Sequence, residues 1–306
     1  MGVWIDTDMG FDDIAAILVL GHCGIPIDGI SLVFGNAELP QVRRNAAGAA
    51  RAFGWLWPIH AGRAHSVLGE VETAARILGP TGIPTAGLSL PSAPEAFGGD
   101  AFTALCAWLE EPAETHRILA LGPLTNIAAL ALARPDLAAR ITDLTWMGGG
   151  VTLGNHTASA EFNAFADPEA LAIVLAHGLP LSMVDLDLCR TVLAFPEDVA
   201  AIAAAGGANA ALIADLLAGF IDIAIRRGRA GMALYDPVAA FAFARPEAVT
   251  FQPARIDVEL AGSLTRGRTV VDPRASADFN ARYATGIDVE AARQTILGAL
   301  RSTAGQ

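Results

Sequence analysis

Four aspartates lie within eight residues near the start of the chain, in the stretch IDTDMGFDD. They are Asp6, Asp8, Asp12 and Asp13, and no lysine or arginine lies inside the stretch. Carboxylates this close repel one another unless a positive charge joins them. A helix N-terminus supplies part of that charge, since Asp12 or Asp13 could cap the helix that follows. Capping does not account for Asp6 and Asp8, which lie on the strand side of the turn.

A bound cation accounts for the aspartates better. The stretch has no cysteine or histidine, and oxygen ligands alone select a hard ion such as Ca²⁺ or Mg²⁺. Two further motifs could complete the ligand set. LYDPVAAF places Asp236 at a predicted helix start, where it could also be a simple N-cap. AEFNAFADPEA supplies Glu161 and Asn163, which alone could be ordinary polar groups of a loop.

Composition limits the possible partners. The 306 residues carry a formal net charge of -12, which argues against nucleic acid and anionic membranes as partners. All twenty basic residues are arginine, so Schiff-base chemistry and the lysine-bearing phosphate loop are excluded. Three scattered cysteines and the lack of a signal-like opening predict a cytoplasmic protein with reduced thiols.

Apolar strand-like runs alternate with alanine- and leucine-rich helical runs. This alternation predicts one α/β domain over residues 1–306, with a mostly parallel central sheet, helices on both faces and a C-terminal extension. The segment 62–99, rich in glycine, proline and serine, predicts a long loop with a short helix, and loops of this length are usually functional or mobile. Ligands of open parallel sheets bind beyond the carboxyl ends of the strands. The polar residues that end the apolar runs should therefore converge on one rim.

The motifs, taken in order, resemble those of the inosine–uridine preferring nucleoside hydrolase family. That family opens with Asp-Thr-Asp-Pro-Gly-x-Asp-Asp and an apolar helix; here the stretch reads DTDMGFDDIAAILVL, with Met9 in place of the usual proline. The similarity continues through FGN, LGPLTNIA, MGGG, GNHTASAEFNAFADPEA and DPVAAF. It implies a Rossmann-like open α/β nucleoside hydrolase fold with a mixed sheet. It also implies a Ca²⁺-dependent enzyme that hydrolyses the N-glycosidic bond of ribonucleosides to ribose and free base.

The resemblance also assigns roles to individual residues. The ligands of Ca²⁺ would be Asp8, Asp13, Asp236 and the backbone carbonyl of Leu121. The residues around the ribose would be Asp12, Asn36, Met147, Asn155, Glu161, Phe162 and Asn163. Asp8 would also be the general base for a metal-bound water, and Asp6 would orient the turn. The implied partners are a small ribonucleoside substrate and a second or further copy of the chain, in a homodimer or homotetramer.

The match to the family fails on the side of the leaving base. Many relatives place a histidine directly before the last metal aspartate, and here that position is Tyr235. A second histidine of some relatives, in the long loop, corresponds to Leu78. Tyr235 could stack on the base and donate a hydrogen bond to it, as a catalytic group, or it could merely fill a wall. The other residues expected to face the base are His156, Phe220 and Arg227.

Three other functions are compatible with parts of the sequence. A ribosyl hydrolase could act on a modified or pyridine nucleoside, because the sugar-binding residues match the family and the base-binding residues differ. A non-catalytic protein that only binds ribonucleosides or ribose is a further possibility. Such a protein would have little reason to keep both the general base and the metal ligands. An aspartate-nucleophile phosphohydrolase also opens with Asp-x-Asp after a strand, but such enzymes usually supply a lysine, and this chain has none.

Overall fold

A computed structural model of the chain describes residues 2–95 and 97–306. Nine strands form its central sheet: β1 (Val3–Thr7), β2 (Ile27–Leu32), β3 (Ile59–Ala61), β4 (Arg117–Ala120), β5 (Asp143–Met147), β6 (Leu181–Val184), β9 (Val249–Val258), β10 (Thr269–Asp272) and β11 (Ala281–Ile287). Their order across the sheet is β10-β9-β11-β6-β5-β4-β1-β2-β3. Two short strands, β7 (Leu193–Ala194) and β8 (Met232–Ala233), form a separate antiparallel pair.

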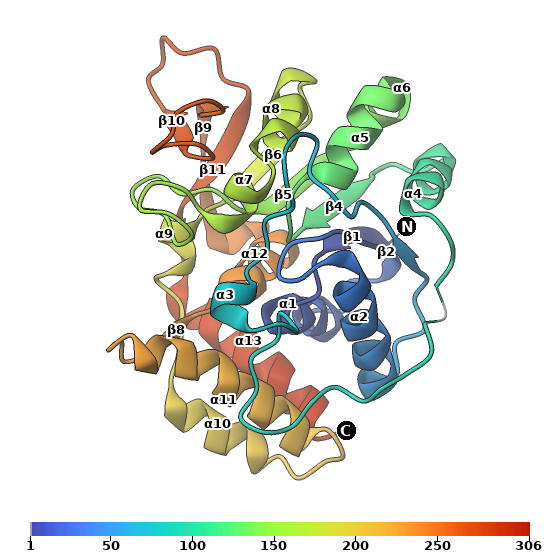
Figure 1. Cartoon of the computed structure of the whole chain (residues 1–306), viewed down its shortest axis with the longest axis vertical. Helices are drawn as coiled ribbons and strands as arrows, with labels where there is room; N and C mark the ends of the chain where they lie inside the picture. Colours follow the sequence, from blue (N-terminus) through green and yellow to red (C-terminus); the bar gives the residue numbers. More distant parts are fainter. Residues whose placement is uncertain (1, 96) are drawn as a thin grey trace.

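The helices cover both faces of the sheet (Figure 1). They are α1 (Phe11–His22), α2 (Leu39–Phe53), α3 (Ala75–Leu78), α4 (Ala101–Glu110), α5 (Thr125–Ala133), α6 (Pro135–Ala138), α7 (Phe162–Ala166), α8 (Pro168–Ala176), α9 (Leu186–Cys189), α10 (Pro196–Ala203), α11 (Ala210–Arg226), α12 (Tyr235–Ala244) and α13 (Val289–Ala304), with a 3-10 turn at Pro246–Ala248. None of the helices in the described ranges is long and apolar enough to cross a membrane.

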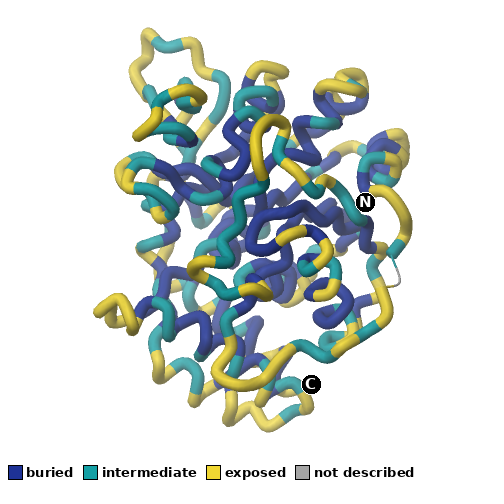
Figure 2. Tube along the Cα trace, viewed as in Figure 1, coloured by how far each residue is buried: buried dark blue, intermediate teal, exposed yellow. Residues whose placement is uncertain are grey.

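Two hydrophobic clusters hold the helices to the sheet. One cluster packs α1, α11, α12 and α13 against one face, and the other packs α4, α5 and α8 against the opposite face. Figure 2 shows buried chain concentrated in the central strands and the helices against them, with exposed chain at the tips. The prediction of a mostly parallel, mixed sheet with helices on both faces is confirmed.

The expected C-terminal extension is wrong, because the chain from Val249 onward completes the central sheet. Strand β11 pairs in parallel with β6, and β9 and β10 add antiparallel strands at that edge. Helix α13 then packs against α1. Strands β9 and β11 mix buried residues with partly buried and exposed ones. They therefore lack the continuous apolar runs that marked the parallel strands in the sequence.

Helix α1 begins at Phe11. Gly10 is the N-cap residue, and the Asp13 carboxylate accepts the Gly10 N–H at 2.8 Å. Asp12 and Asp13 therefore lie in the first turn rather than before it. This position suits negative side chains, because the N-terminal N–H groups and the helix dipole attract them.

The chain order places the aspartate turn at a special position of the sheet. From β1 the chain builds β2 and β3 on one side, and it later builds β4, β5 and β6 on the other. The strand order thus reverses between β1 and β4, which is where open α/β sheets bind ligands beyond the strand ends. The aspartate turn follows β1 directly, and α3, in the loop that follows β3, lies over the same edge (Figure 1).

Candidate active site

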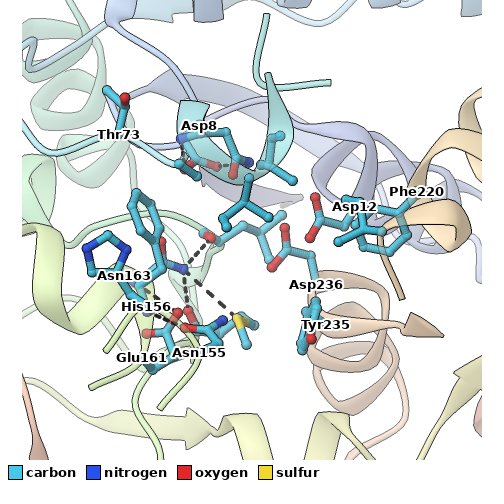
Figure 3. Close-up of a pocket in the computed structure, with 18 of the residues that line it drawn as sticks. Asp8, Asp12, Thr73, Asn155, His156, Glu161, Asn163, Phe220, Tyr235 and Asp236 are labelled. Carbon is cyan, nitrogen blue, oxygen red and sulfur yellow. Dashed lines mark hydrogen bonds between the residues drawn. The ribbon is translucent and has the colours of Figure 1, made fainter. Parts of the chain in front are cut away.

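A pocket opens beyond the carboxyl ends of β1, β4 and β5 (Figure 3). Every residue predicted for the site except Asp13 lines it: Asp8, Asp12, Asn36, Leu78, Leu121, Met147, Asn155, His156, Glu161, Phe162, Asn163, Phe220, Arg227, Tyr235 and Asp236. The polar ends of the apolar runs therefore meet at one rim, and Asp13 lies directly behind it.

Several lining residues were not foreseen from the sequence. They are Thr73, Ala74, Arg76, Ile77, Ile223 and Met232. The first four belong to α3 and the residues just before it, in the long loop. The length of that loop was the available signal, since a loop of this size in a compact fold is usually functional, but it did not identify particular side chains.

Asp8 is fixed by its contacts with the turn after β2. Its two carboxylate oxygens accept the backbone N–H of Asn36 at 2.6 Å and the Asn36 side-chain amide at 2.9 Å. The same amide donates to Asp13 at 3.1 Å. Asn36, predicted to hold ribose, thus also orients two of the predicted metal ligands. A Cβ on the preceding residue, Gly35, would overlap the Asp8 carboxylate, so this turn needs glycine.

Met9, the departure from the family pattern, has an unusual backbone conformation. Its φ is +49°, the one positive φ outside glycine in the described chain. A proline ring would hold φ near −65°, so the turn here differs from one built on proline. The left-handed region costs a residue like Met about 1–2 kcal/mol. Full burial of the Met9 side chain offsets that cost, together with two hydrogen bonds: the Met9 N–H donates to the Thr7 hydroxyl oxygen, and the Met9 carbonyl accepts from the Asn45 amide.

Carboxylates accumulate beneath the pocket without a positive side chain to balance them. Oxygens of Asp12, Asp13 and Asp236 lie within 4.8 Å of one another. Figure 3 shows the Asp12 and Asp236 carboxylates pointing toward each other. Asp8 is close enough to share a hydrogen bond with Asp13. No ion pair within the described ranges involves any of the four.

The electrostatics of this cluster fit a bound cation. Burial, followed by repulsion from neighbouring aspartates, raises the pKa of Asp8 and of Asp236 well above the usual range. Burial and the Asp13 charge raise the pKa of Asp12 to about 7. Such a group of buried carboxylates is costly unless a positive charge joins it. An all-oxygen ligand set suits a hard divalent ion.

Asp6 lies behind the turn and supports it. Burial raises the pKa of Asp6 to about 7. One carboxylate oxygen accepts hydrogen bonds from the Ser31 hydroxyl and, at 2.7 Å, from the Asn126 amide. The backbone carbonyl of Asp6 accepts the Leu121 N–H at 2.8 Å. Asp6 therefore links β1 to the ends of β2 and β4, and it does not line the pocket.

The Asn163 amide joins two strand ends at the pocket floor. It donates to the carbonyls of Leu121 at 2.8 Å and Met147 at 2.9 Å. A carbonyl oxygen has two lone pairs, so Leu121 can accept this bond and still serve as a ligand. The arrangement leaves the Asn163 carbonyl oxygen to accept a hydrogen bond from a bound molecule.

Glu161 has a structural task as well as a place in the pocket. It is the N-cap of α7, where its carboxylate accepts the N–H groups of Asn163 at 2.8 Å and Ala164 at 3.0 Å. It also accepts the Gly149 N–H at 2.8 Å, which holds the glycine-rich turn after β5. Burial outweighs these bonds and raises the pKa of Glu161 to about 7. Asn155 accepts the Phe162 N–H at 2.9 Å and so holds the loop beside Glu161.

The far side of the pocket is mainly apolar. Leu78 and Ile77 come from α3, Phe220 and Ile223 from α11, and Met232 from β8. Tyr235 begins α12, directly before Asp236, and burial raises the pKa of its hydroxyl. His156 lies beside the Phe162 and Phe165 rings, and its Nε2 is 3.3 Å from Glu72. Loss of hydration lowers the pKa of His156.

Fold and pocket together define a class of protein. An open α/β sheet carries, at its switch point, a pocket with buried carboxylates at its floor, amide and carboxylate groups along one side and an apolar wall along the other. The family model for inosine-uridine preferring nucleoside hydrolases matches residues 3–294. The chain belongs to this family, whose members are enzymes that act on the N-glycosyl bonds of nucleosides.

Individual relatives agree with this assignment. The pyrimidine-specific ribonucleoside hydrolase RihA of Salmonella typhimurium is 32% identical over 273 residues, which cover 88% of this chain and 87% of that protein. The solved structure of a purine-preferring ribonucleoside hydrolase from Gardnerella vaginalis superposes with a TM-score of 0.91 at 26% identity, over 100% of this chain and 99% of that one. An inosine–guanosine nucleoside hydrolase superposes with a TM-score of 0.87 at 26% identity, over 99% and 98% of the two chains.

Proposed function

We propose that this protein hydrolyses the N-glycosidic bond of ribonucleosides, with Ca²⁺ as its cofactor, and releases ribose and the free base. One observation carries the proposal: the residues that matched the family's motifs from distant parts of the sequence line a single pocket above a cluster of unbalanced carboxylates. The related proteins named as ribonucleoside hydrolases support it.

Four groups are suited to hold the cation. They are the carboxylates of Asp8, Asp13 and Asp236 and the carbonyl of Leu121. When bound, Ca²⁺ would balance their charge and help to orient a water molecule and the ribose hydroxyls. Asp12 lies within the same group of oxygens. It extends toward the pocket, where it could accept a hydrogen bond from a ribose hydroxyl.

Asp8 is proposed as the general base. Its carboxylate is oriented by Asn36 and lines the pocket, so it can take a proton from an attacking water molecule. A bound cation would keep the Asp8 carboxylate ionised and therefore able to accept a proton.

The carboxylates would also stabilise the transition state directly. Breaking a ribosyl bond places positive charge on C1′ and the ring oxygen, as in other glycoside hydrolyses. Fixed negative groups around the ribose are most favourable when that charge develops, so they lower the barrier rather than only binding the substrate.

The remaining polar residues would position the sugar. Asn36 and Asn163 would bind the 2′- and 3′-hydroxyls. Asn155 and Glu161 would bind the 5′-hydroxyl. Phe162 would pack against the ribose ring, and Met147 would lie at the floor of the pocket. Buried groups left without a hydroxyl partner are costly, so the site should prefer ribose to deoxyribose. Leu78, Phe220 and Tyr235 would contact the base, and the Tyr235 hydroxyl could donate a hydrogen bond to it.

A panel of substrates tests the proposal. Reducing-sugar release is measured for uridine, cytidine, inosine, adenosine and guanosine, with and without a calcium chelator. The expected result is ribose release that stops with the chelator and returns with added Ca²⁺. Binding without turnover would instead support a non-catalytic binding protein. Phosphate release from phosphate esters would support a phosphohydrolase.

Assembly and location stay predictions. The expectation is a homodimer or homotetramer in the cytoplasm. Sedimentation of the purified protein at several concentrations measures the oligomeric state. Fractionation of cells measures the location.

A further inference from the structure

The pocket is divided by charge. Its floor holds the carboxylates of Asp8, Asp12 and Asp236 (Figure 3). Its mouth holds two arginines: Arg76 in α3 and Arg227 at the C-terminal end of α11. The two come from segments far apart in the sequence, and both side chains are exposed.

Neither arginine is engaged elsewhere in the described parts of the chain. No ion pair or side-chain hydrogen bond holds the Arg76 or Arg227 guanidinium. Arg226, by contrast, pairs with Asp222 at 2.6 Å. An arginine offers five N–H donors and a permanent positive charge, and here both sets of donors are available to a molecule in the pocket.

Charges of both signs act around the base side of the pocket. Glu72, 3.3 Å from Nε2 of His156, raises the pKa of that histidine, and the Arg76 charge lowers it. On the opposite wall, Arg190 and Arg229 lower the pKa of the Tyr235 hydroxyl, and Asp12 raises it. Arg76 and Arg227 have no ion-pair partner in the described ranges, so their charge stays available to a base held at the mouth.

The proposed reaction develops positive charge on the ribose, which faces the carboxylates, and negative charge on the base, which faces the arginines. The C1′–N bond breaks, and its electron pair goes to the base nitrogen. The water oxygen forms the new bond to C1′, its proton goes to Asp8, and solvent later protonates the base. With a neutral nucleoside, the ribose becomes positive while the base becomes negative.

We infer that Arg76 and Arg227 stabilise the negative charge of the departing base and select against nucleosides whose base is a cation. The inference rests on the proposed function. A cationic pyridine nucleoside brings a positive ring against the two arginines and releases a neutral base, so it gains nothing from them. The favoured substrates are therefore neutral ribonucleosides, and the pyridine nucleosides that the sequence left open are disfavoured.

The test compares four substrates with different leaving groups: uridine, inosine, 4-nitrophenyl riboside and nicotinamide riboside. In the double variant Arg76→Met/Arg227→Met, kcat/KM should fall about 10- to 100-fold on the first three, because all release an anion. Hydrolysis of nicotinamide riboside should rise. Arg227→Lys should recover much of the loss of Arg227→Met, and the matched control Arg226→Met should leave all four rates unchanged.

Tyr235→Phe separates charge stabilisation from proton donation. A lost proton donor slows uridine and inosine but spares 4-nitrophenyl riboside, whose leaving group is stable without a proton. Equal losses on all four substrates in the double variant, no loss at all, or a loss confined to uridine and inosine would each overturn the inference. Failure of the wild type to hydrolyse any of the four would overturn the proposed function itself.

Discussion

The floor and the mouth of the pocket are built differently. At the floor and directly behind it, Asp8, Asp236 and Asp13 are at most 3% exposed, and they lie where strands end or helices begin. At the mouth, Arg76 belongs to a helix of four residues, and Arg227 follows the last turn of α11. The floor is fixed by the sheet and its hydrogen bonds, whereas the mouth is held by a loop and a helix end.

This difference affects how easily the two parts of the site can change in sequence among related proteins. A change at the floor disturbs several carboxylates and strand ends together. A change at the mouth touches exposed side chains on segments that carry little of the core. Relatives named as pyrimidine-specific, purine-preferring and inosine–guanosine enzymes accordingly share the fold. Substitutions at the floor should therefore lower activity on every substrate, whereas the effects of substitutions at the mouth should depend on the substrate.

The largest effect is expected for Asp8→Asn. The amide cannot take a proton from water, so kcat should fall by about 10²- to 10⁴-fold. The amide oxygen can still act as a ligand, so Ca²⁺ binding measured by calorimetry should persist, although weakened. A variant with near-native kcat would remove Asp8 as the base.

Gly35→Ala tests how tightly the floor is packed. The new Cβ would overlap the Asp8 carboxylate and displace it, so kcat should fall about 10- to 100-fold, as for other residues that orient ligands. Gly21→Ala is the matched control, because nothing lies within 4 Å of its Cβ. That variant should keep its activity and, by helix propensity, gain up to about 1 kcal/mol of unfolding free energy. Equal activities of the two variants would contradict the packing described.

Cation binding should depend on pH. In the metal-free protein the raised pKa values, about 7 for Asp12, mean that protons occupy some of these carboxylates near neutral pH. The cation must displace them, so its affinity should fall as pH decreases, about tenfold per unit for each proton displaced. Calorimetric titrations at pH 6 and pH 8 measure this change. The same affinity at both values would contradict the shifted pKa values.

Without a cation, the same shifts bear on stability. An aspartate has a pKa near 3.8 in the unfolded chain and holds its proton more tightly when folded. The metal-free protein should therefore lose stability as pH rises from about 4 to about 7, and Ca²⁺ should restore it. Thermal unfolding with and without the cation follows both changes. Stability that instead rises over this range would show that other groups dominate.

The smallest effect is expected for Glu72→Gln at the mouth. The Glu72 side chain is 47% exposed, and its contact with His156 spans 3.3 Å. Exposed pairs of this kind contribute about 0–1 kcal/mol, so KM should change less than about threefold and the thermal midpoint very little. A large loss of kcat would instead make the Glu72–His156 pair part of the catalytic machinery.

The sequence predicted the floor far better than the mouth, for a physical reason. The aspartate turn and Asn36 follow apolar runs that form β1 and β2, and the parallel-sheet rule brings such positions together. Asn163 and Asp236 were assigned through the family motifs that contain them. Arg76 lies in a loop whose path depends on tertiary contacts, such as the Asn45 amide holding the Thr81 carbonyl at 2.8 Å. No local pattern encodes that contact. The pairing of Asn36 with Asp8 and the left-handed Met9 were likewise outside what spacing could indicate.

The central claim is that one divalent cation, held by the carboxylate floor, is needed for ribonucleoside hydrolysis. The most direct test removes metal from the protein with a chelator, adds Ca²⁺ in steps, and measures bound Ca²⁺ and ribose release from uridine and inosine together. The account predicts no release at the start and a rise in activity that saturates at one Ca²⁺ per chain. Full ribose release by the metal-free protein would contradict it.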